Sequence, residues 1–466
     1  METGYLEVIT ACDGVPVQAA ITILSGDAAL YKLQTDENGK AEAVELAAPP
    51  RGLSQDPKYM DAPYSTCNIQ AEAPGFAKVC VYGVMIFDGE TSIIPIDMHP
   101  ENDNPREYHV PTHQLINPAG RRMETPDTIH KLLPEIKIPE FITVHMGHPD
   151  SPAPNIQVPF IDYIKNAVSH EIFPVWPSAA LEANIYCIIS LALNRVFTKS
   201  YQAHGHDCDN ANGYGACGQD FDITNNPMFD PIYVEGGQIF RSIDIMVDSI
   251  FNRFIKREGH QEPFFAEYSD GRYNTCPGLW QWGTVDLANR GFDALHILQH
   301  YYPRDIHIVE INEIGGIEKP FPGYLLREGM SGSHVRDLQV MLNRIGVNFP
   351  GIPMIDPVTG IYGPETAAAV RAFMCIHRNE TEPAGNIVNK DAWNRISLAF
   401  SAVKRKNEAE LAVKDTCPII SSSDADTLPI PSGPHQIPTP PMDNISANQL
   451  LTMFLVSQAL LRQGAG

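Results

Sequence analysis

One carboxylate in an apolar setting is the residue best suited to chemistry in this sequence. Glu171 lies in HEIFPVWPSAALEANIY, residues 170–186, just before a Trp-Pro pair. Burial beside Ile172, Phe173 and Trp176 would disfavour the ionised carboxylate and keep a proton on it, as a general acid requires. The alternative is an ordinary surface glutamate that caps the next turn, which the residues alone favour.

A second group of residues has the composition of a metal site. The insertion AHGHDCDNANGYGACGQDFD places His204, His206, Cys208 and Cys217 within fourteen positions. Imidazole and thiolate are the ligands that zinc prefers, and four of them could close a tetrahedral structural site. The His-x-His-x-Cys spacing is unusual, so a Cys208–Cys217 disulfide and an unliganded loop both stay open. Apart from this zinc, no cofactor is required.

The elements that must position Glu171 belong to a central unit, residues 141–310. FITVHMG predicts a strand, and PFIDYIKNAVSHEI has the apolar period of a helix that ends near Glu171. SAALEANIYCIISLALNRVF is apolar nearly all round, so it predicts a buried helix. IFRSIDIMVDSIFNRFIKREG predicts a third helix closed by Gly259, and TVDLANRGFDALHILQHYY two shorter helices that break at Gly291.

Other segments flank this unit on both sides. Residues 1–100 alternate like strands between turns such as CDGVP and DENGK, which predicts a small antiparallel β-sandwich. Residues 101–140 read as a connector, and residues 320–400 as a compact helical unit whose first helix ends at Gly346. The predicted fold class is therefore α+β and modular.

The C-terminal segment has a different character. Residues 415–443 are rich in Pro and Ser without a periodic apolar face, which is typical of an extended linker. Residues 444–463 then predict a short amphipathic helix. Its apolar stripe could pack back on the body or dock on a protein partner beyond the linker.

Charge and hydropathy exclude several classes of partner. The 466 residues carry a formal net charge of −23 at pH 7. Nucleic acid and anionic lipid need a basic footprint, so neither is expected as the main partner. The N-terminus METGYLEVITACDG lacks a basic and then apolar run, and no uninterrupted apolar stretch of membrane-spanning length follows. We expect a protein made in the cytoplasm, without a signal peptide or a membrane span.

Two flanking regions resemble known families. The stretches VPVQAAITI, TDENGKAE and YSTCNIQAEAPGFAK resemble the carboxypeptidase regulatory-like family, which implies a structural β-module. The stretches LREGMSGSHVRDLQVMLNRIG, DPVTGIYGPETAAAVRAF and AGNIVNKDAWNRI resemble the type 1 peptidoglycan-binding domain, over residues 324–396. That resemblance implies glycan contacts at Gln339, Tyr362, Thr366 and Trp393. The sequence departs from the family pattern at Met374, where Gln usually stands.

The central unit resembles the stage II sporulation protein D family, a lytic-transglycosylase-like and amidase-enhancer-like group. The resemblance rests on VPFIDYIKNAVSHEIFPVWPSAALEANIYCIISLALNR, FDITNNPMFDPIYVEG and EPFFAEYSDGRYNTCPGLWQWGTVDLANRGFDALHILQHYYP. By position, Glu171 would be the catalytic acid. A lytic transglycosylase needs no carboxylate nucleophile, because a hydroxyl of the sugar attacks the anomeric carbon. The family's helix has Gln and Arg where this chain has Asn184 and Ile189, and its substrate turn is changed too.

These resemblances imply a peptidoglycan-binding protein of the bacterial cell wall whose partner is the glycan strand. Its central domain could cleave glycan as a lytic transglycosylase or hydrolase. The alternative is a non-catalytic structural or adaptor component of a spore layer or extracellular particle. The rewritten helix favours the alternative, and the retained Glu171 favours the enzyme. In either case the protein would act at the wall, or in a spore or extracellular structure, after release.

Overall fold

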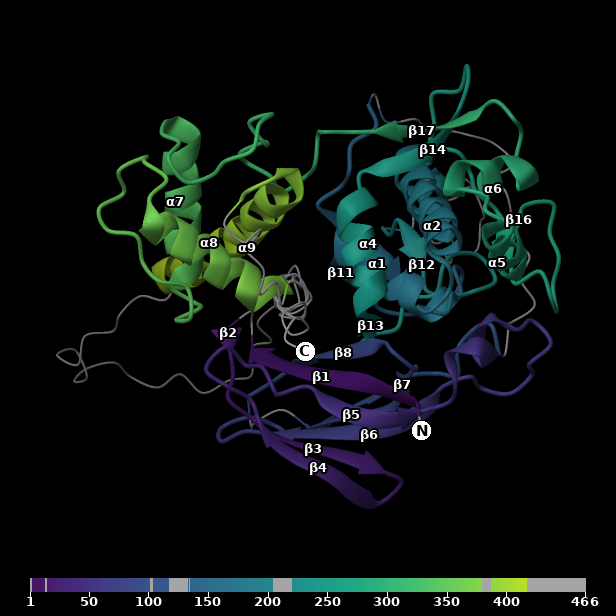
Figure 1. Cartoon of the computed structure of the whole chain (residues 1–466), viewed down its shortest axis with the longest axis horizontal. Coiled ribbons are helices and arrows are strands. Elements are labelled where there is room, and N and C mark those ends of the chain that lie inside the picture. Colours follow the sequence, from purple (N-terminus) through teal and green to yellow (C-terminus); the bar gives the residue numbers. More distant parts are fainter. Residues whose placement is uncertain are drawn as a thin grey trace, which may run out of the picture.

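The chain folds into a strand-rich N-terminal part, a mixed central part and a helical C-terminal part, as Figure 1 shows. The computed structural model describes residues 2–12, 15–100, 104–116, 133, 135–203, 220–378 and 387–416. The mixed content of strands and helices confirms the α+β, modular fold class. We call the three parts the β-sandwich (residues 2–116), the central body (residues 135–314) and the helical unit (residues 321–416).

The β-sandwich consists of two sheets around an apolar layer. Its strands are β1 (Glu2–Cys12), β2 (Val15–Pro16), β3 (Ala20–Ser25), β4 (Ala28–Gln34), β5 (Val44–Ala48), β6 (Ser65–Glu72), β7 (Val79–Ile86), β8 (Thr91–Asp97) and β9 (Arg106–His109). One sheet has the order β8-β1-β2 with β5 also on β1, and the other has the order β4-β3-β6-β7-β9. Successive residues of a strand point to opposite faces. Leu6 and Val8 accordingly enter the main core, while Ile9 and Ala11 lie in a separate small cluster.

Two strand pairs differ from the antiparallel arrangement that the sequence predicts. β1 and β8 run parallel, with Tyr5 opposite Thr91, and β7 and β9 also run parallel. Parallel pairing needs a crossover rather than a hairpin, and alternation of side chains carries no information on strand direction. The strand β9 also lies within residues 101–140, so part of the predicted connector belongs to a sheet.

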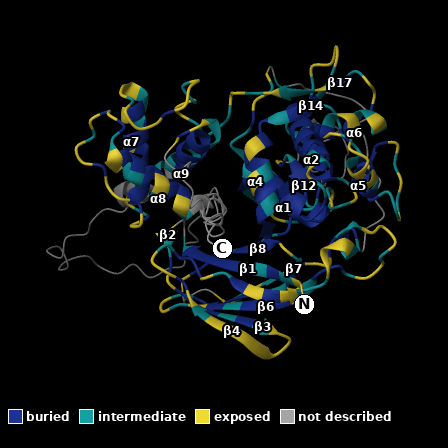
Figure 2. Ribbon diagram, in the orientation of Figure 1, coloured by how far each residue is buried: buried dark blue, intermediate teal, exposed yellow. Residues whose placement is uncertain are grey.

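The central body surrounds one buried helix. Its elements are β10 (Phe141–His145), β11 (Asn155–Pro159), α1 (Phe160–Glu171), α2 (Ser178–Thr198), α3 (Ser200–Ala203), β12 (Ile223–Thr224), β13 (Ile239–Phe240), α4 (Arg241–Ile250), β14 (Arg253–Arg257), β15 (Tyr268–Ser269), β16 (Leu279–Trp280), α5 (Gln281–Asn289), α6 (Ala294–Tyr301) and β17 (Ile306–Glu310). Figure 2 shows α2 buried along its length. Ser178–Gln202 is long and apolar enough to cross a membrane. However, 89% of an 18-residue apolar stretch within it is buried inside the protein, and a buried core helix has the same length and composition.

One predicted helix of the central body is shorter than expected. α4 ends at Ile250, and the residues that were expected to continue it to Gly259 form β14 instead. Phe254 and Ile255 pair with Val309 and Ile308 of β17. Aromatic and β-branched residues fit such a half-buried ribbon, and this distant partner strand overrides the local helical period. The break between α5 and α6 lies at Gly291, where φ is +88°, as predicted.

The β-sandwich and the central body share one hydrophobic core. β13 pairs with β8, so the central body adds a strand to the first sheet of the sandwich. The side chain of Gln238 accepts from the backbone N–H of Met85 at 2.8 Å, and Arg241 forms a buried ion pair with Glu7 at 2.7 Å. Apolar residues of both parts form a continuous cluster. The two parts are therefore packed as one continuous body.

The helical unit has a core of its own. It comprises α7 (Ser333–Gly346), α8 (Pro364–Arg378) and α9 (Lys390–Thr416), and α7 ends at Gly346 as predicted. Its buried apolar residues form a cluster that shares no member with the main core. It contacts the central body through Arg395, which pairs with Asp248 of α4, and through Lys390, whose ammonium donates to Asn312 Oδ1 at 2.8 Å.

Candidate functional site

Glu171 lies at the last residue of α1 and is 0% exposed. Its Oε1 accepts from the backbone N–H of Ile232 at 2.9 Å. The side-chain amide of Gln281, the first residue of α5, donates to the Glu171 carbonyl oxygen at 3.3 Å and to Oε2 at 3.4 Å. The carboxylate thus joins the end of α1 to the 230–234 segment and to α5.

The Trp-Pro pair after Glu171 is part of a buried aromatic cluster. The rings of Trp176 and Trp282 lie 5.0 Å apart, and Phe173 meets Trp282 edge-on at 5.9 Å. The indole N–H of Trp176 donates to the carbonyl oxygen of Ser54 in the 3₁₀ helix η1 (Arg51–Gln55) of the β-sandwich. Trp176 therefore anchors the central body on the sandwich.

The histidines near Glu171 carry no charge at neutral pH. Burial lowers the pKa of His170 to about 4. Burial, together with repulsion from His170, lowers the pKa of His113 to about 3. His113 Nε2 also lies 3.3 Å from the carbonyl oxygen of Ile172. Neither imidazole offers a proton at pH 7 to a reaction at Glu171.

Side chains of α1 and α2 hold the 230–234 segment, which contacts Glu171, in place. The sequence analysis did not predict this role. Asn166 of α1 donates to the carbonyl oxygen of Val234 and accepts from its N–H, both at 2.9 Å. Arg195 of α2 donates to Asp230 Oδ1 at 2.8 Å, and Thr224 donates to Asp230 Oδ2. Polar residues in an otherwise apolar helix were the available signal, because such residues must find partners when buried.

The four residues predicted to contact glycan are all buried. Gln339 is 1% exposed, and its amide N–H donates to Ile361 O and to Thr366 Oγ1, each at 2.9 Å. Its Oε1 accepts from the N–H of Gly360 at 2.8 Å. The ring of Tyr362 lies in the core, and the indole of Trp393 donates to the carbonyl oxygen of Lys319 at 2.7 Å. All four therefore stabilise the helical unit, and contact with glycan stays a prediction for each.

Other residues of the helical unit are exposed. Tyr324 is 48% exposed, and its hydroxyl lies 3.3 Å from Nδ1 of His334 at the start of α7. Ile361, beside Gln339's turn, is 57% exposed and forms a backbone bridge with Ser331. The inner motif residues thus fix the turn at Gly360 and Ile361, while Tyr324, His334 and Ile361 are at least partly exposed.

The predicted zinc site lies outside the described residues. His204, His206, Cys208 and Cys217 all fall within residues 204–219, and the linker and the C-terminal helix beyond residue 416 also lie outside. Among the residues that the structure does describe, no group of three or more His, Cys, Asp or Glu side chains could hold a metal ion. Zinc, disulfide and unliganded loop remain the alternatives for this insertion.

Comparison with known families identifies one part of the helical unit. Residues 331–373 match the peptidoglycan binding domain. The match runs from the bridge residue Ser331 through α7 and the turn held by Gln339 to Phe373 in the middle of α8. It supports the resemblance over the helical unit. This match does not bear on the two other resemblances, to the stage II sporulation protein D and carboxypeptidase regulatory-like families, which stay predictions.

Comparison with whole proteins gives one weak structural likeness. No curated protein matches the chain. One solved structure, described as the Bacillus anthracis TIE protein, has 10% sequence identity and a TM-score of 0.14. The aligned part covers 34% of this chain and 24% of that one. This chain thus matches about a quarter of the length of TIE, and a TM-score of 0.14 is too low to indicate a shared fold.

Proposed function

We propose that this protein binds peptidoglycan through its helical unit and that the β-sandwich and central body serve as a rigid, non-catalytic platform. The observation that carries the proposal is the family match at residues 331–373. The match falls inside a three-helix unit with its own core. A unit of this kind can recognise the wall without chemistry from the rest of the chain.

The glycan contacts would come from the outer face of the motif. Sugar rings present flat C–H faces edged by hydroxyl groups, which suits an exposed aromatic ring beside hydrogen-bonding groups. Tyr324 with His334 offers a ring beside a hydrogen-bonding group, and Ile361 offers an exposed aliphatic side chain. The buried Gln339 would act indirectly, because it holds the backbone of Gly360 and Ile361 in place.

The burial of Glu171 supports the non-catalytic alternative for the central body. A general acid must come within hydrogen-bond reach of the leaving oxygen, about 2.6–3.2 Å. Glu171 has no exposed surface, and its two oxygens face Ile232 and Gln281. Glycan cleavage by this residue would require the 230–234 segment and α5 to move away from α1.

Sedimentation with purified sacculi tests the binding proposal on the full chain. We expect the wild type to pellet with sacculi, and Tyr324→Ala and Ile361→Ser each to weaken retention about three- to tenfold, the effect of losing roughly 1 kcal/mol of contact. Val347→Ala is the matched control, because Val347 is an exposed aliphatic residue (64%) just after α7. Equal loss in the control variant, or no effect of either face variant, would contradict the proposed contact face.

The same proposal places the protein's site of action at the wall. Acting on peptidoglycan, in a cell wall, a spore layer or an extracellular structure, requires release from the compartment of synthesis. Fractionation of producing cells, with the chain detected by antibody in cytosolic, wall and medium fractions, would test it. A protein confined to the cytosol throughout growth and sporulation would contradict a wall function.

A further inference from the structure

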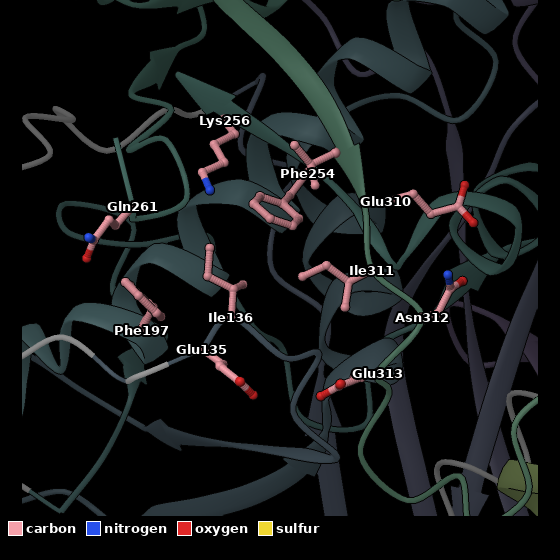
Figure 3. A pocket seen from close by; sticks show the side chains of 11 residues that line it. Glu135, Ile136, Phe197, Phe254, Lys256, Gln261, Glu310, Ile311, Asn312 and Glu313 are labelled. Atoms are coloured by element: carbon pink, nitrogen blue, oxygen red, sulfur yellow. The ribbon is translucent and has the colours of Figure 1, made fainter. Parts of the chain in front are cut away.

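A pocket of about 660 Å³ lies in the central body, away from Glu171 and beside the helical unit. Figure 3 shows its lining side chains. Strands β14 and β17 supply one wall, and the segments 135–138 and 311–315 run alongside each other to form another. The volume falls within the range of about 300–1,000 Å³ that is usual for small-molecule and cofactor sites.

The floor of this pocket is apolar. Phe197 of α2 and Phe254 of β14 are buried, and Ile136, Val309 and Ile311 are half-buried around them. When a ligand covers half-buried aliphatic side chains that face a cavity, apolar surface is removed from water, which favours binding. The floor therefore favours a ligand with an aliphatic middle portion.

The rim carries opposite charges at opposite ends. In Figure 3, Lys256 projects from one edge, and Glu135 and Glu313 lie at the opposite edge. Both glutamates pair with one ammonium, that of Lys137, at 3.3 and 3.0 Å. Two carboxylates that share one cation leave one negative charge uncompensated there. Among the described residues, Lys256 has no carboxylate within ion-pair distance, so its end remains positive.

The pocket is next to the attachment of the helical unit. Glu310 and Asn312 line it, and both accept from Lys390 of α9. Glu310 is therefore already occupied by Lys390 and by Arg253, whose Nε lies 3.0 Å from it.

We propose that the pocket binds a short peptide with one free ammonium group and one free carboxylate, of the kind carried by the stem peptides of peptidoglycan. The ammonium would lie at Glu135 and Glu313, the carboxylate at Lys256, and the aliphatic portion on the apolar floor. This inference rests on the proposed wall function for its choice of peptide. The charge separation and the floor come from the pocket alone.

Calorimetric titration of the full chain tests this site. The probe is a synthetic pentapeptide, N-acetyl-L-Ala-γ-D-isoglutaminyl-L-Lys-D-Ala-D-Ala, in which the α-carboxyl of the D-Glu residue is amidated, so the lysine ε-amine is the one ammonium group and the C-terminus the one carboxylate. We expect saturable binding at one site. Lys256→Met and Glu313→Gln should each weaken it about tenfold, as expected for loss of one charge-assisted hydrogen bond. Acetylation of the probe's ε-amine and amidation of its C-terminus should weaken binding to a similar extent.

Matched controls separate the pocket from a general charge effect. Lys32→Met and Glu37→Gln change exposed residues of the β-sandwich, so they should leave binding unchanged. Unfolding curves of all four variants should overlay the wild type, because none of the changed side chains is buried. Equal affinity in Lys256→Met and in the wild type, equal affinity for the acetylated probe, or no binding at about 1 mM would overturn the proposal.

The same samples distinguish failure of the site from failure of the function. If wild type pellets with sacculi but ignores the pentapeptide, the pocket proposal falls and wall binding stands. If the pentapeptide binds with the expected variant pattern but sacculi do not retain the chain, the pocket is a peptide site and the proposed wall function falls.

Discussion

Replacing Gln339 by Leu tests whether the matched motif builds the helical unit or touches the ligand. Leu has a similar volume but removes the acceptor for Gly360 N–H and the donor to Ile361 O and Thr366 Oγ1. Each buried polar group left without a partner costs about 1–3 kcal/mol. Partial relaxation of the turn should leave a net loss of about 3–5 kcal/mol in the stability of the helical unit.

Urea unfolding of the full chain, followed by hydrogen exchange at the amides of α7, measures this loss locally. Thr366→Val is the graded control, because it keeps the shape of the side chain and removes one of the three hydrogen bonds of Gln339. It should cost about 1 kcal/mol. A Gln339→Leu protein with unchanged protection in α7 and with lost binding to sacculi would refute the structural role and restore Gln339 as a contact residue.

Three further perturbations follow from the buried charges. Glu171→Gln should lower stability by about 1–3 kcal/mol, because its amide opposes the Gln281 amide, and sacculi digests should contain no anhydro-sugars with either protein. Anhydro-sugars from the wild type alone would restore Glu171 as the general acid. Burial raises the pKa of Asp162 to about 8, so the folded state holds the extra proton and stability falls as pH rises from about 4 to 8. Asp162→Asn should flatten that slope in urea titrations at several pH values, and an unchanged slope would contradict the assignment. Arg395→Met leaves Asp248 without its link to α9, so solution scattering should report a larger radius of gyration, and an unchanged radius would show that other contacts hold the helical unit.

The features that local patterns determine could be predicted from the sequence. The mostly apolar run at 178–197 forms the core helix α2, and the period of α7 and its end at Gly346 were both confirmed. Gly291 separates two short helices because its positive φ suits glycine. These features depend on residues that are near one another in the chain, so the local sequence predicts them.

Features that depend on distant partners could not be predicted. Phe254 and Ile255 fit a helical period, but a partner strand more than fifty residues away turns them into β14. The parallel pairing of β1 with β8 likewise depends on a crossover between them. Strand direction is not encoded in the alternation of side chains.

The candidate site shows the same division. The apolar neighbours of Glu171 do surround it, but burial is complete, and its partners Ile232 and Gln281 come from segments far along the chain. The motif that identifies the helical unit was visible in sequence. Which of its residues face outward was not, because a glutamine in such a motif can equally bind a ligand or hold a turn.

The most direct test of the central claim is sedimentation of an isolated fragment, residues 319–416, which contains the helical unit, with purified sacculi. The fragment includes Lys319, whose carbonyl accepts from the indole of Trp393, and it retains the whole of its separate core. We predict that the fragment is folded by circular dichroism and pellets with sacculi at low salt. A folded fragment recovered wholly in the supernatant would contradict the claim that this unit binds peptidoglycan.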